Sequence, residues 1–176
     1  MNRSVVNYET MRVLVALSNK QLAEYIWHFL KDNGVRNVQV VHHSRDALLR
    51  MTSTVFTHFI VGHHLDDAGG PDFTRFIRMC EGAVAEAPVL LVMSNPSAEK
   101  VVECRDSGVN EIMVTPITGK LLETRLQHMT AKPKQFIRSA TYIGPDRRRP
   151  NAPLFEGVDL RKYGSNTGSN QRQPAE

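Results

Sequence analysis

Short aliphatic runs alternate with segments of helical periodicity over the first 129 residues of the chain. The runs are apolar throughout, which is typical of strands buried on both faces of a sheet. The segments between them carry apolar residues three and four positions apart, as in amphipathic helices. The expected strands are Met11–Leu17, Asn37–His42, Thr57–Gly62, Val89–Met93 and Asn110–Val114. The expected helices are Asn19–Asn33, a helix capped by Ser44, Asp72–Glu86, Ser97–Ser107 and Ile117–Met129.

This alternation predicts an α/β fold, a doubly wound five-stranded parallel sheet with five helices on its two faces. Ligands of such folds bind beyond the carboxyl ends of the strands. The informative positions are therefore the residues that follow each strand, namely 17–19, 42–43, 62–67, 93–95 and 115–116.

Apolar periodicity stops at Thr130, where proline and glycine begin to interrupt every segment. Residues 1–129 contain 13 basic and 14 acidic side chains, whereas residues 130–176 contain 9 and 4. We therefore divide the chain into an N-terminal arm (1–10), an α/β domain (11–129), a basic extension (130–163) and a tail (164–176). The tail is rich in Ser, Asn, Gln and Gly, which predicts disorder, and we expect the whole C-terminal region to be irregular.

Composition excludes several classes of protein. No apolar run approaches the roughly 20 residues that span a bilayer, and residues 1–11 carry no secretory signal pattern. The two cysteines, Cys80 and Cys104, are expected to be reduced, packed thiols of a cytoplasmic protein. A membrane protein and a disulfide scaffold are thereby excluded.

Several local motifs occur in a characteristic order. They are Val13-Leu14-Val15-Ala16, Leu30-Lys31-Asp32-Asn33-Gly34, Pro88-Val89-Leu90-Leu91-Val92, Asp106-Ser107-Gly108-Val109-Asn110 and Met113-Val114-Thr115-Pro116. Together they resemble the receiver domain of bacterial response regulators, over about residues 11–129. The resemblance implies a flavodoxin-like fold with strand order 2-1-3-4-5, and a proline at position 116 that is cis in the family.

The chemistry of that family is phosphoryl transfer to an aspartate. An acidic pair holds Mg²⁺, and a hydroxyl and a lysine hold the phosphoryl oxygens. In this chain the acidic pair falls on Leu17 and Ser18, and the acceptor falls on His63. The hydroxyl position falls on Met93, followed by Ser94, and the lysine position falls on Thr115, before Pro116. The resemblance thus implies a pseudo-receiver with no bound metal or other cofactor and no ammonium to balance a phosphoryl group.

Two alternatives remain open at this edge of the sheet. Asp66 or Asp67 is either a displaced phosphoacceptor or a solvated carboxylate that caps the next helix. The pairs His42-His43 and His63-His64 are either ordinary loop histidines or a zinc or pH-sensing site. Because neighbouring residues of a strand point to opposite faces, we expect the members of a pair to diverge.

The basic extension interleaves aromatic and aliphatic residues with arginine. Its candidate ligand-binding residues are Arg138, Tyr142, Asp146, Arg147, Arg148 and Arg149. Guanidinium groups bind phosphates and stack on purines, and the segment resembles arginine-rich segments that bind cyclic di-GMP. The second motif of PilZ-type domains is missing, and three arginines are too few for duplex DNA. The alternatives are a protein-binding segment and a tail whose residues Phe136, Ile137, Tyr142 and Ile143 cover an apolar surface.

The expected function is that of a non-enzymatic, phosphorylation-independent signalling module of a two-component or chemotaxis-type pathway. It would bind a partner protein through the face formed by the fourth helix, the fifth strand and the fifth helix. Candidate partners are a histidine kinase, a chemotaxis or flagellar component, or a second copy of the chain. The alternatives are a cyclic di-GMP effector and an active receiver that uses Asp66 or Asp67.

Overall fold

The computed structural model describes residues 7–131 and 133–147. The chain divides into two compact units, Met1–Asp146 and Arg147–Glu176. The expected disorder of residues 164–176 concerns residues outside those described. All of the architecture below belongs to the first unit.

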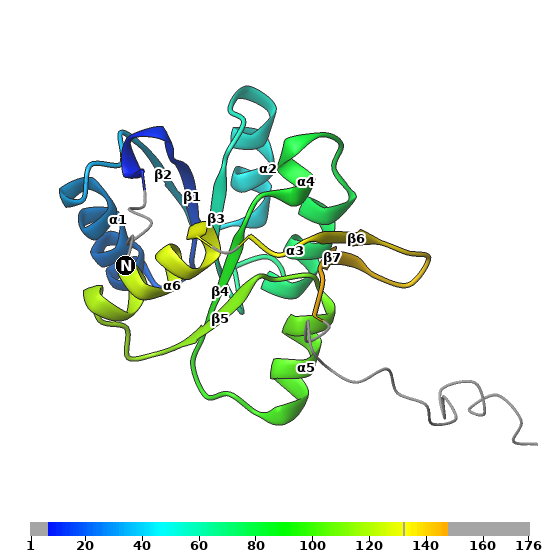
Figure 1. Cartoon of the computed structure of the whole chain (residues 1–176). Helices are drawn as coiled ribbons and strands as arrows, with labels where there is room; N and C mark the ends of the chain where they lie inside the picture. The colour runs from blue at the N-terminus through cyan, green and yellow to red at the C-terminus, as the bar shows by residue number, and fades with distance from the viewer. Residues whose placement is uncertain (1–6, 132, 148–176) are drawn as a thin grey trace, which may run out of the picture. The chain divides into compact units, whose positions relative to one another are not determined.

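Five parallel strands form the central sheet in the order β2-β1-β3-β4-β5 (Figure 1). Their bounds are Arg12–Ala16 (β1), Asn37–Val41 (β2), His58–Gly62 (β3), Val89–Met93 (β4) and Glu111–Val114 (β5). In the parallel register of the sheet, Val15 lies opposite Ile60 and Val61 lies opposite Leu91. The predicted topology is confirmed.

Helices cover both faces of this sheet. Their bounds are Lys20–Asp32 (α1), Ser44–Ser53 (α2), Gly70–Met79 (α3), Ala83–Glu86 (α4), Ala98–Asp106 (α5) and Gly119–Ala131 (α6), and a 3₁₀ turn, Tyr8–Thr10, precedes β1. One apolar cluster joins α1 and α6 to one face of the sheet, and a second joins α2, α3 and α5 to the other. Alternate residues of β1 separate into the two clusters, with Val13 and Val15 in the first and Leu14 and Ala16 in the second.

Two helix predictions differ from the structure. The helix expected over Asp72–Glu86 is broken after Met79, and Gly82, with a φ of 71°, begins the short α4. Ser44 is the first residue of α2 and does not cap it, because His43 occupies the N-cap position. Instead the Asp67 carboxylate accepts hydrogen bonds from the backbone amides of Ser44 (2.6 Å) and Arg45 (3.1 Å).

A short antiparallel hairpin occupies part of the region that was expected to be irregular. Its strands are Phe136–Arg138 (β6) and Ile143–Pro145 (β7). The hairpin packs closely on the domain: a Cβ atom added to Gly108 would lie 2.6 Å from the Ile143 carbonyl oxygen, and one added to Gly144 would lie 2.8 Å from the Gly108 Cα. Glycine is required at both positions because the two backbones approach so closely. The structure thus agrees with a segment that folds back on the domain.

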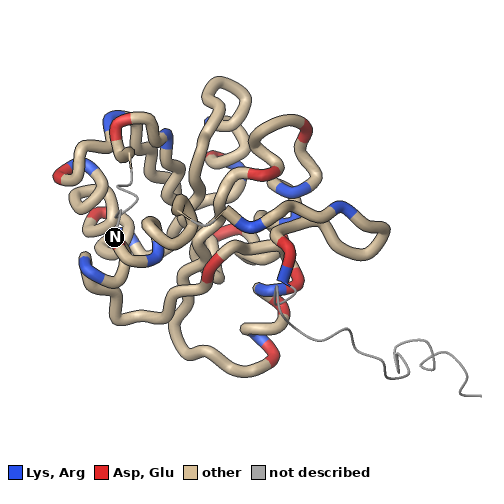
Figure 2. Tube along the Cα trace, viewed as in Figure 1, with Lys and Arg blue, Asp and Glu red and all other residues tan. Residues whose placement is uncertain are grey.

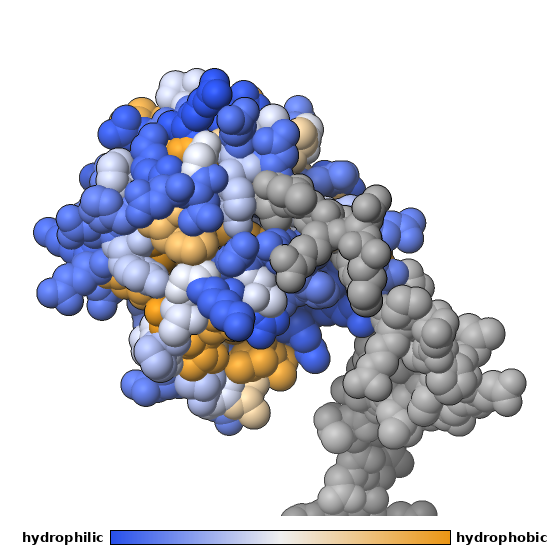
Figure 3. All heavy atoms as spheres, turned by 60° about the vertical axis from the view of Figure 1, so that its left-hand side comes forward, coloured by the Kyte–Doolittle hydropathy of each residue, from blue (hydrophilic) through white to orange (hydrophobic). Residues whose placement is uncertain are grey.

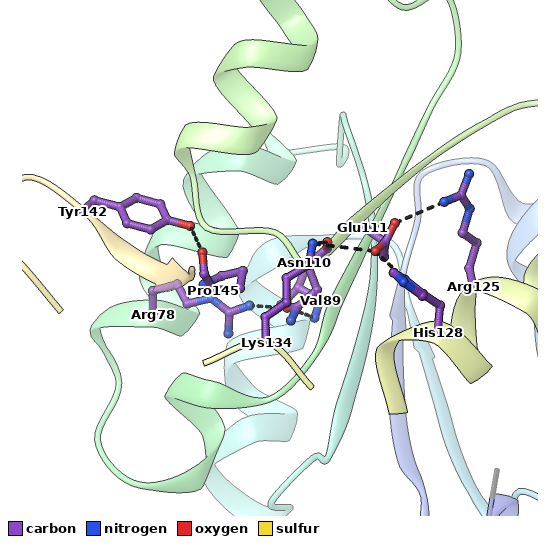
Figure 4. A network of polar contacts seen from close by, with 9 residues as sticks. All are labelled: Arg78, Val89, Asn110, Glu111, Arg125, His128, Lys134, Tyr142 and Pro145. Atoms are coloured by element: carbon purple, nitrogen blue, oxygen red, sulfur yellow. Dashed lines mark hydrogen bonds and ion pairs between the residues drawn. The ribbon is translucent and has the colours of Figure 1, made fainter. Parts of the chain in front are cut away.

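A buried arginine lies beneath this hairpin (Figure 4). Arg78 of α3 is 1% exposed and donates hydrogen bonds to the carbonyl oxygens of Gly108, Ala85 and Ala87 and to the Asn110 side chain, at 2.7–2.9 Å. The Phe136 ring centroid lies 5.3 Å from its guanidinium carbon. One side chain therefore links α3, the α4 turn, the start of β5 and the hairpin.

Charged residues lie mostly on the helices and loops, and the central strands are largely free of them (Figure 2). Among the described residues, no helix is both long enough and apolar enough to cross a bilayer.

Candidate functional site

The carboxyl edge of the sheet carries a pocket of about 650 Å³. Backbone hydrogen bonds fix its floor: Leu17 donates to Val41, His63 to Val92 and Thr115 to Met93, at 2.7–3.1 Å. These three residues directly follow β1, β3 and β5, so the parallel register brings them to one edge.

All seven residues that sequence placed at the phosphorylation positions line this one pocket. They are Leu17, Ser18, His63, Met93, Ser94, Thr115 and Pro116. Leu17 and Met93 are buried, and the peptide bond between Thr115 and Pro116 is cis. The structure therefore brings the predicted set together.

The pocket lining is free of aspartate and glutamate. Its one ammonium belongs to Lys100, in the first turn of α5, a residue that sequence analysis did not single out. The absence of a lysine at position 115 therefore does not leave the pocket without a cation. Lys100 was missed because a single lysine in the first turn of a surface helix looks like an ordinary solvated residue.

His63 and His64 contact each other instead of diverging. The His63 Nδ1 atom lies 3.0 Å from the His64 Nε2 atom, and the ring centroids are 4.3 Å apart. The expectation of opposite faces is wrong because β3 ends at Gly62, so strand alternation no longer applies. Burial and the positive charges of His64 and Lys100 hold the pKa of His63 below its usual value, against the opposing effect of Glu103. His63 therefore favours the neutral form near neutral pH.

The other histidine pair has separate partners. The His42 Nδ1 atom lies 2.7 Å from the Leu17 carbonyl oxygen, and the His43 Nε2 atom lies 3.9 Å from the Asp66 carboxylate. Among the described residues, no group of three or more His, Cys, Asp and Glu side chains is arranged to hold a metal ion.

Neither candidate displaced acceptor lines the pocket. Asp67 binds the first turn of α2, and its hydrogen bonds from the backbone amides of Ser44 and Arg45 lower the pKa of its carboxyl group. It thus caps the preceding helix, α2, and not the next one as the capping interpretation expected. The Asp66 carboxylate is exposed and lies 3.9 Å from the His43 Nε2 atom.

The residues of the arginine-rich segment are only partly described. Arg138 is exposed on β6, with its guanidinium carbon 5.7 Å from the Phe136 ring centroid. The Tyr142 hydroxyl donates to the Pro145 carbonyl oxygen at 2.9 Å, so it closes the hairpin. Asp146 follows β7, Arg147 is the last described residue, and Arg148 and Arg149 lie outside the described residues.

A second polar cluster surrounds Glu111 on β5 (Figure 4). Its carboxylate, 13% exposed, lies 2.9 Å from His128, 3.2 Å from Arg125 and 3.8 Å from Lys134. Because Arg125 and His128 belong to α6, these contacts join the edge strand to that helix and to the segment that leads into the hairpin. We interpret this cluster as structural. The two cysteines are free thiols, with Cys104 buried.

Comparison with known proteins agrees with this architecture. No protein-family model matches the sequence. The chemotaxis protein CheY of Pseudomonas aeruginosa is 24% identical over 117 residues, which are 66% of this chain and 94% of that protein. CheY-3 of Vibrio cholerae is 24% identical over 118 residues, which are 67% of this chain and 90% of that protein.

Solved structures show the same fold. Chemotaxis response regulator CheY4 of Vibrio cholerae matches with a TM-score of 0.62 and 25% identity, over 68% of this chain and 98% of that chain. The receiver domain of a sensor histidine kinase from Pseudomonas aeruginosa, solved with magnesium coordinated in its active-site cleft, matches with a TM-score of 0.63 and 20% identity, over 69% and 98%. Sequence similarity and fold together support a CheY-like response-regulator receiver domain in this chain.

Proposed function

We propose that this receiver domain is a cytoplasmic, non-enzymatic signalling module that acts by binding a partner protein, without being phosphorylated. The observation that carries the proposal is the pocket lining, which contains no aspartate or glutamate. Mg²⁺ is bound through carboxylate oxygens in protein sites of this kind, and Leu17 and Ser18 offer none. A phosphoryl donor would therefore meet neither the metal nor the acceptor that the reaction requires.

The contacts of Asp66 and Asp67 argue against a displaced acceptor. The Asp67 carboxylate is occupied at the start of α2, and Asp66 faces His43. The Asp67 carboxylate would have to leave its hydrogen bonds to Ser44 and Arg45 to reach a phosphoryl group beside His63.

Incubation with acetyl phosphate and Mg²⁺, followed by intact-mass measurement, tests the loss of phosphotransfer. We expect the mass to stay unchanged in the full chain and in the variants Asp66→Asn and Asp67→Asn. A mass gain of one phosphoryl group that Asp66→Asn or Asp67→Asn abolishes would overturn the proposal and establish an active receiver.

The surface that favours a protein partner is formed by α5, β5 and α6, the elements that correspond to the expected docking face. Val101 and Val102 of α5 and Val114 of β5 are 37%, 43% and 39% exposed. Apolar residues also gather in the lower half of the molecule in the view of Figure 3. Exposed apolar groups at a sheet edge and its neighbouring helix are typical of interaction surfaces.

This surface is tested by comparing how much partner protein the unmodified chain and the variant Val102→Glu capture from native lysate. We expect partner recovery to fall at least about tenfold, as for a residue central to an interface. Leu49→Glu is the matched control, because Leu49 is 68% exposed on α2, which contacts β1 and β2 at the other end of the sheet. Equal recovery with both variants would exclude this face, and a sedimentation shift that Val102→Glu abolishes would identify the partner as a second copy.

A cyclic di-GMP effector is the second candidate function. The observation that favours it is a hairpin with Arg138 exposed on β6, and in the sequence Asp146 and then Arg147, Arg148 and Arg149 follow β7. Calorimetric titration of the full chain with the dinucleotide should then give heat that the double variant Arg148→Ala/Arg149→Ala loses. No heat from the unmodified chain at tens of micromolar would end this candidate (a Kd near 1 μM corresponds to about −8 kcal/mol).

A further inference from the structure

The pocket at the carboxyl edge combines a positive end with an apolar wall. Lys100 of α5 supplies the positive charge, and the imidazoles of His63 and His64 lie beside it at the end of β3. No carboxylate belongs to the lining, and Glu103 lies 3.9 Å from His63 outside it. Leu22, Tyr25 and Ile117 line the same pocket from α1 and from the turn before α6, which cover the other face of the sheet. The two kinds of lining therefore enter the cavity from opposite helix layers.

The imidazole of His63 is the second, independent indication of a ligand. The residue is 9% exposed, it lines the pocket, and its Nε2 atom has no hydrogen-bond partner among the described residues. The Glu103 carboxylate lies 3.9 Å from that atom, beyond hydrogen-bond distance. Because buried polar atoms are nearly always paired, an unpaired one on a residue that lines a cavity favours a ligand that supplies the partner.

Neutral hydrogen-bonding side chains complete the lining. Ser94, Asn95 and Thr115 follow β4 and β5, and Asn19 and Gln21 lie at the start of α1. Asn19 caps that helix by accepting from the Leu22 amide at 2.9 Å, and the first turn of α1 contains no acidic residue. The amino end of a helix favours a negative group, so it adds to the positive potential of Lys100.

We propose that this pocket reversibly binds the phosphate group of a small phosphorylated molecule, without a metal ion. The inference rests on the proposed loss of phosphotransfer, because an acidic, Mg²⁺-binding pocket would repel the same group. Lys100 and the donors around it bind the phosphate oxygens, and His63 provides a further contact at the positive end. The volume exceeds that of a phosphate ion and lies in the range of small-molecule sites, so the apolar wall accommodates an organic ester group.

Titration of the ¹⁵N-labelled full chain, followed by amide chemical shifts in metal-free buffer, tests the proposal. The probes are inorganic phosphate, phenyl phosphate and phenol. We expect phenyl phosphate to shift the amides of Ser18, His63 and Thr115, to bind more tightly than inorganic phosphate, and to be competed by it, whereas phenol gives little change. The proposal would be overturned if these amides did not shift with either phosphate probe up to about 20 mM, because a site with a millimolar Kd would be largely occupied at that concentration.

Substitutions in α5 distinguish a specific phosphate-binding site from nonspecific attraction of anions. Lys100→Gln should lower the affinity for phenyl phosphate about tenfold, because the loss of one charge-assisted contact costs about 1.4 kcal/mol. Lys100→Arg should retain much of the affinity of the unmodified chain. Arg105→Gln is the matched control, since it removes one positive charge from the same helix, where Arg105 pairs with Asp106. Equal weakening by Lys100→Gln and Arg105→Gln would overturn the site.

Two further outcomes identify the source of the phosphate and keep the proposals distinct. Equal affinity for phenyl phosphate and inorganic phosphate would overturn the organic ester and assign inorganic phosphate. Intact mass measured after each titration reports covalent transfer: a mass gain overturns the proposed function, whereas an unchanged mass without binding overturns this inference alone.

Discussion

Arg78 is the residue on which the packing of the C-terminal half depends most. Its guanidinium is buried and bonds three carbonyl oxygens and the Asn110 side chain. Burial lowers its pKa to about 10, against the opposing effects of Tyr142 and Glu86, which leaves it charged near neutral pH. The sequence indicates this role only weakly. Arg78 lies one helical turn after Thr74, and both residues are on a buried side of α3.

We predict that Arg78→Ala lowers the free energy of unfolding by about 3 kcal/mol or more, because four hydrogen bonds are lost in a buried site. Urea unfolding monitored by circular dichroism measures this. Arg75→Ala is the matched control on the same helix: Arg75 forms an exposed pair with Asp72, so its loss should cost less than about 1 kcal/mol. A similar small cost for both variants would contradict the role of Arg78.

His58 provides a pH-dependent contribution to stability. Burial lowers its pKa from 6.5 to about 4, and its Nδ1 atom lies 3.0 Å from the Thr57 hydroxyl. Between these two pH values the unfolded chain binds a proton that the folded chain does not, so stability falls as the pH falls. The full difference is at most about 3.5 kcal/mol, since the pKa falls from 6.5 to about 4 and each pKa unit corresponds to about 1.4 kcal/mol.

We therefore expect the loss of stability from pH 7 to pH 4.5 to be smaller in His58→Gln than in the unmodified chain. His28→Gln, at a side chain that is 60% exposed, is the control substitution. Urea unfolding at the two pH values provides the comparison. The same slope in all three proteins would exclude His58 as its source.

At the scale of elements, the strands and most helices follow from the periodicity of the sequence. The apolar runs predicted the five parallel strands. The parallel register of these strands in the structure brings Leu17, His63 and Thr115 to one edge of the sheet. The helix expected over Asp72–Glu86 fails at Gly82, where a positive φ outweighs the apolar spacing. The hairpin escaped prediction because strands of three residues have too few positions to show a period, and its stability comes from contacts with α3 and Gly108.

The hairpin should behave as part of the domain. A chain ending at residue 131 loses the Phe136 ring over Arg78 and the packing of Ile143 on Gly108. We predict that this truncation lowers the midpoint of thermal unfolding by several degrees, corresponding to about 1–2 kcal/mol. A chain ending at Arg147 is the control, because it retains the hairpin and should keep the original midpoint.

At the scale of the whole molecule, a receiver fold surrounds a pocket whose charge is opposite to that required for magnesium. The seven residues that the resemblance singled out line one pocket, whereas Lys100 could not be found from sequence, because its position in the pocket depends on how α5 packs. The neutral or positive lining, the exposed valines of α5 and β5, and the hydrogen-bonded carboxylate of Asp67 are consistent with signalling through binding.

The most direct test of the central claim is a crystal structure of the full chain obtained with magnesium and beryllofluoride, which mimics a phosphoryl group on an acceptor. The account predicts no metal and no beryllofluoride bonded to an aspartate at the end of β3, with His63 still in contact with His64. Magnesium and beryllofluoride bound together beside the tip of that strand would contradict it.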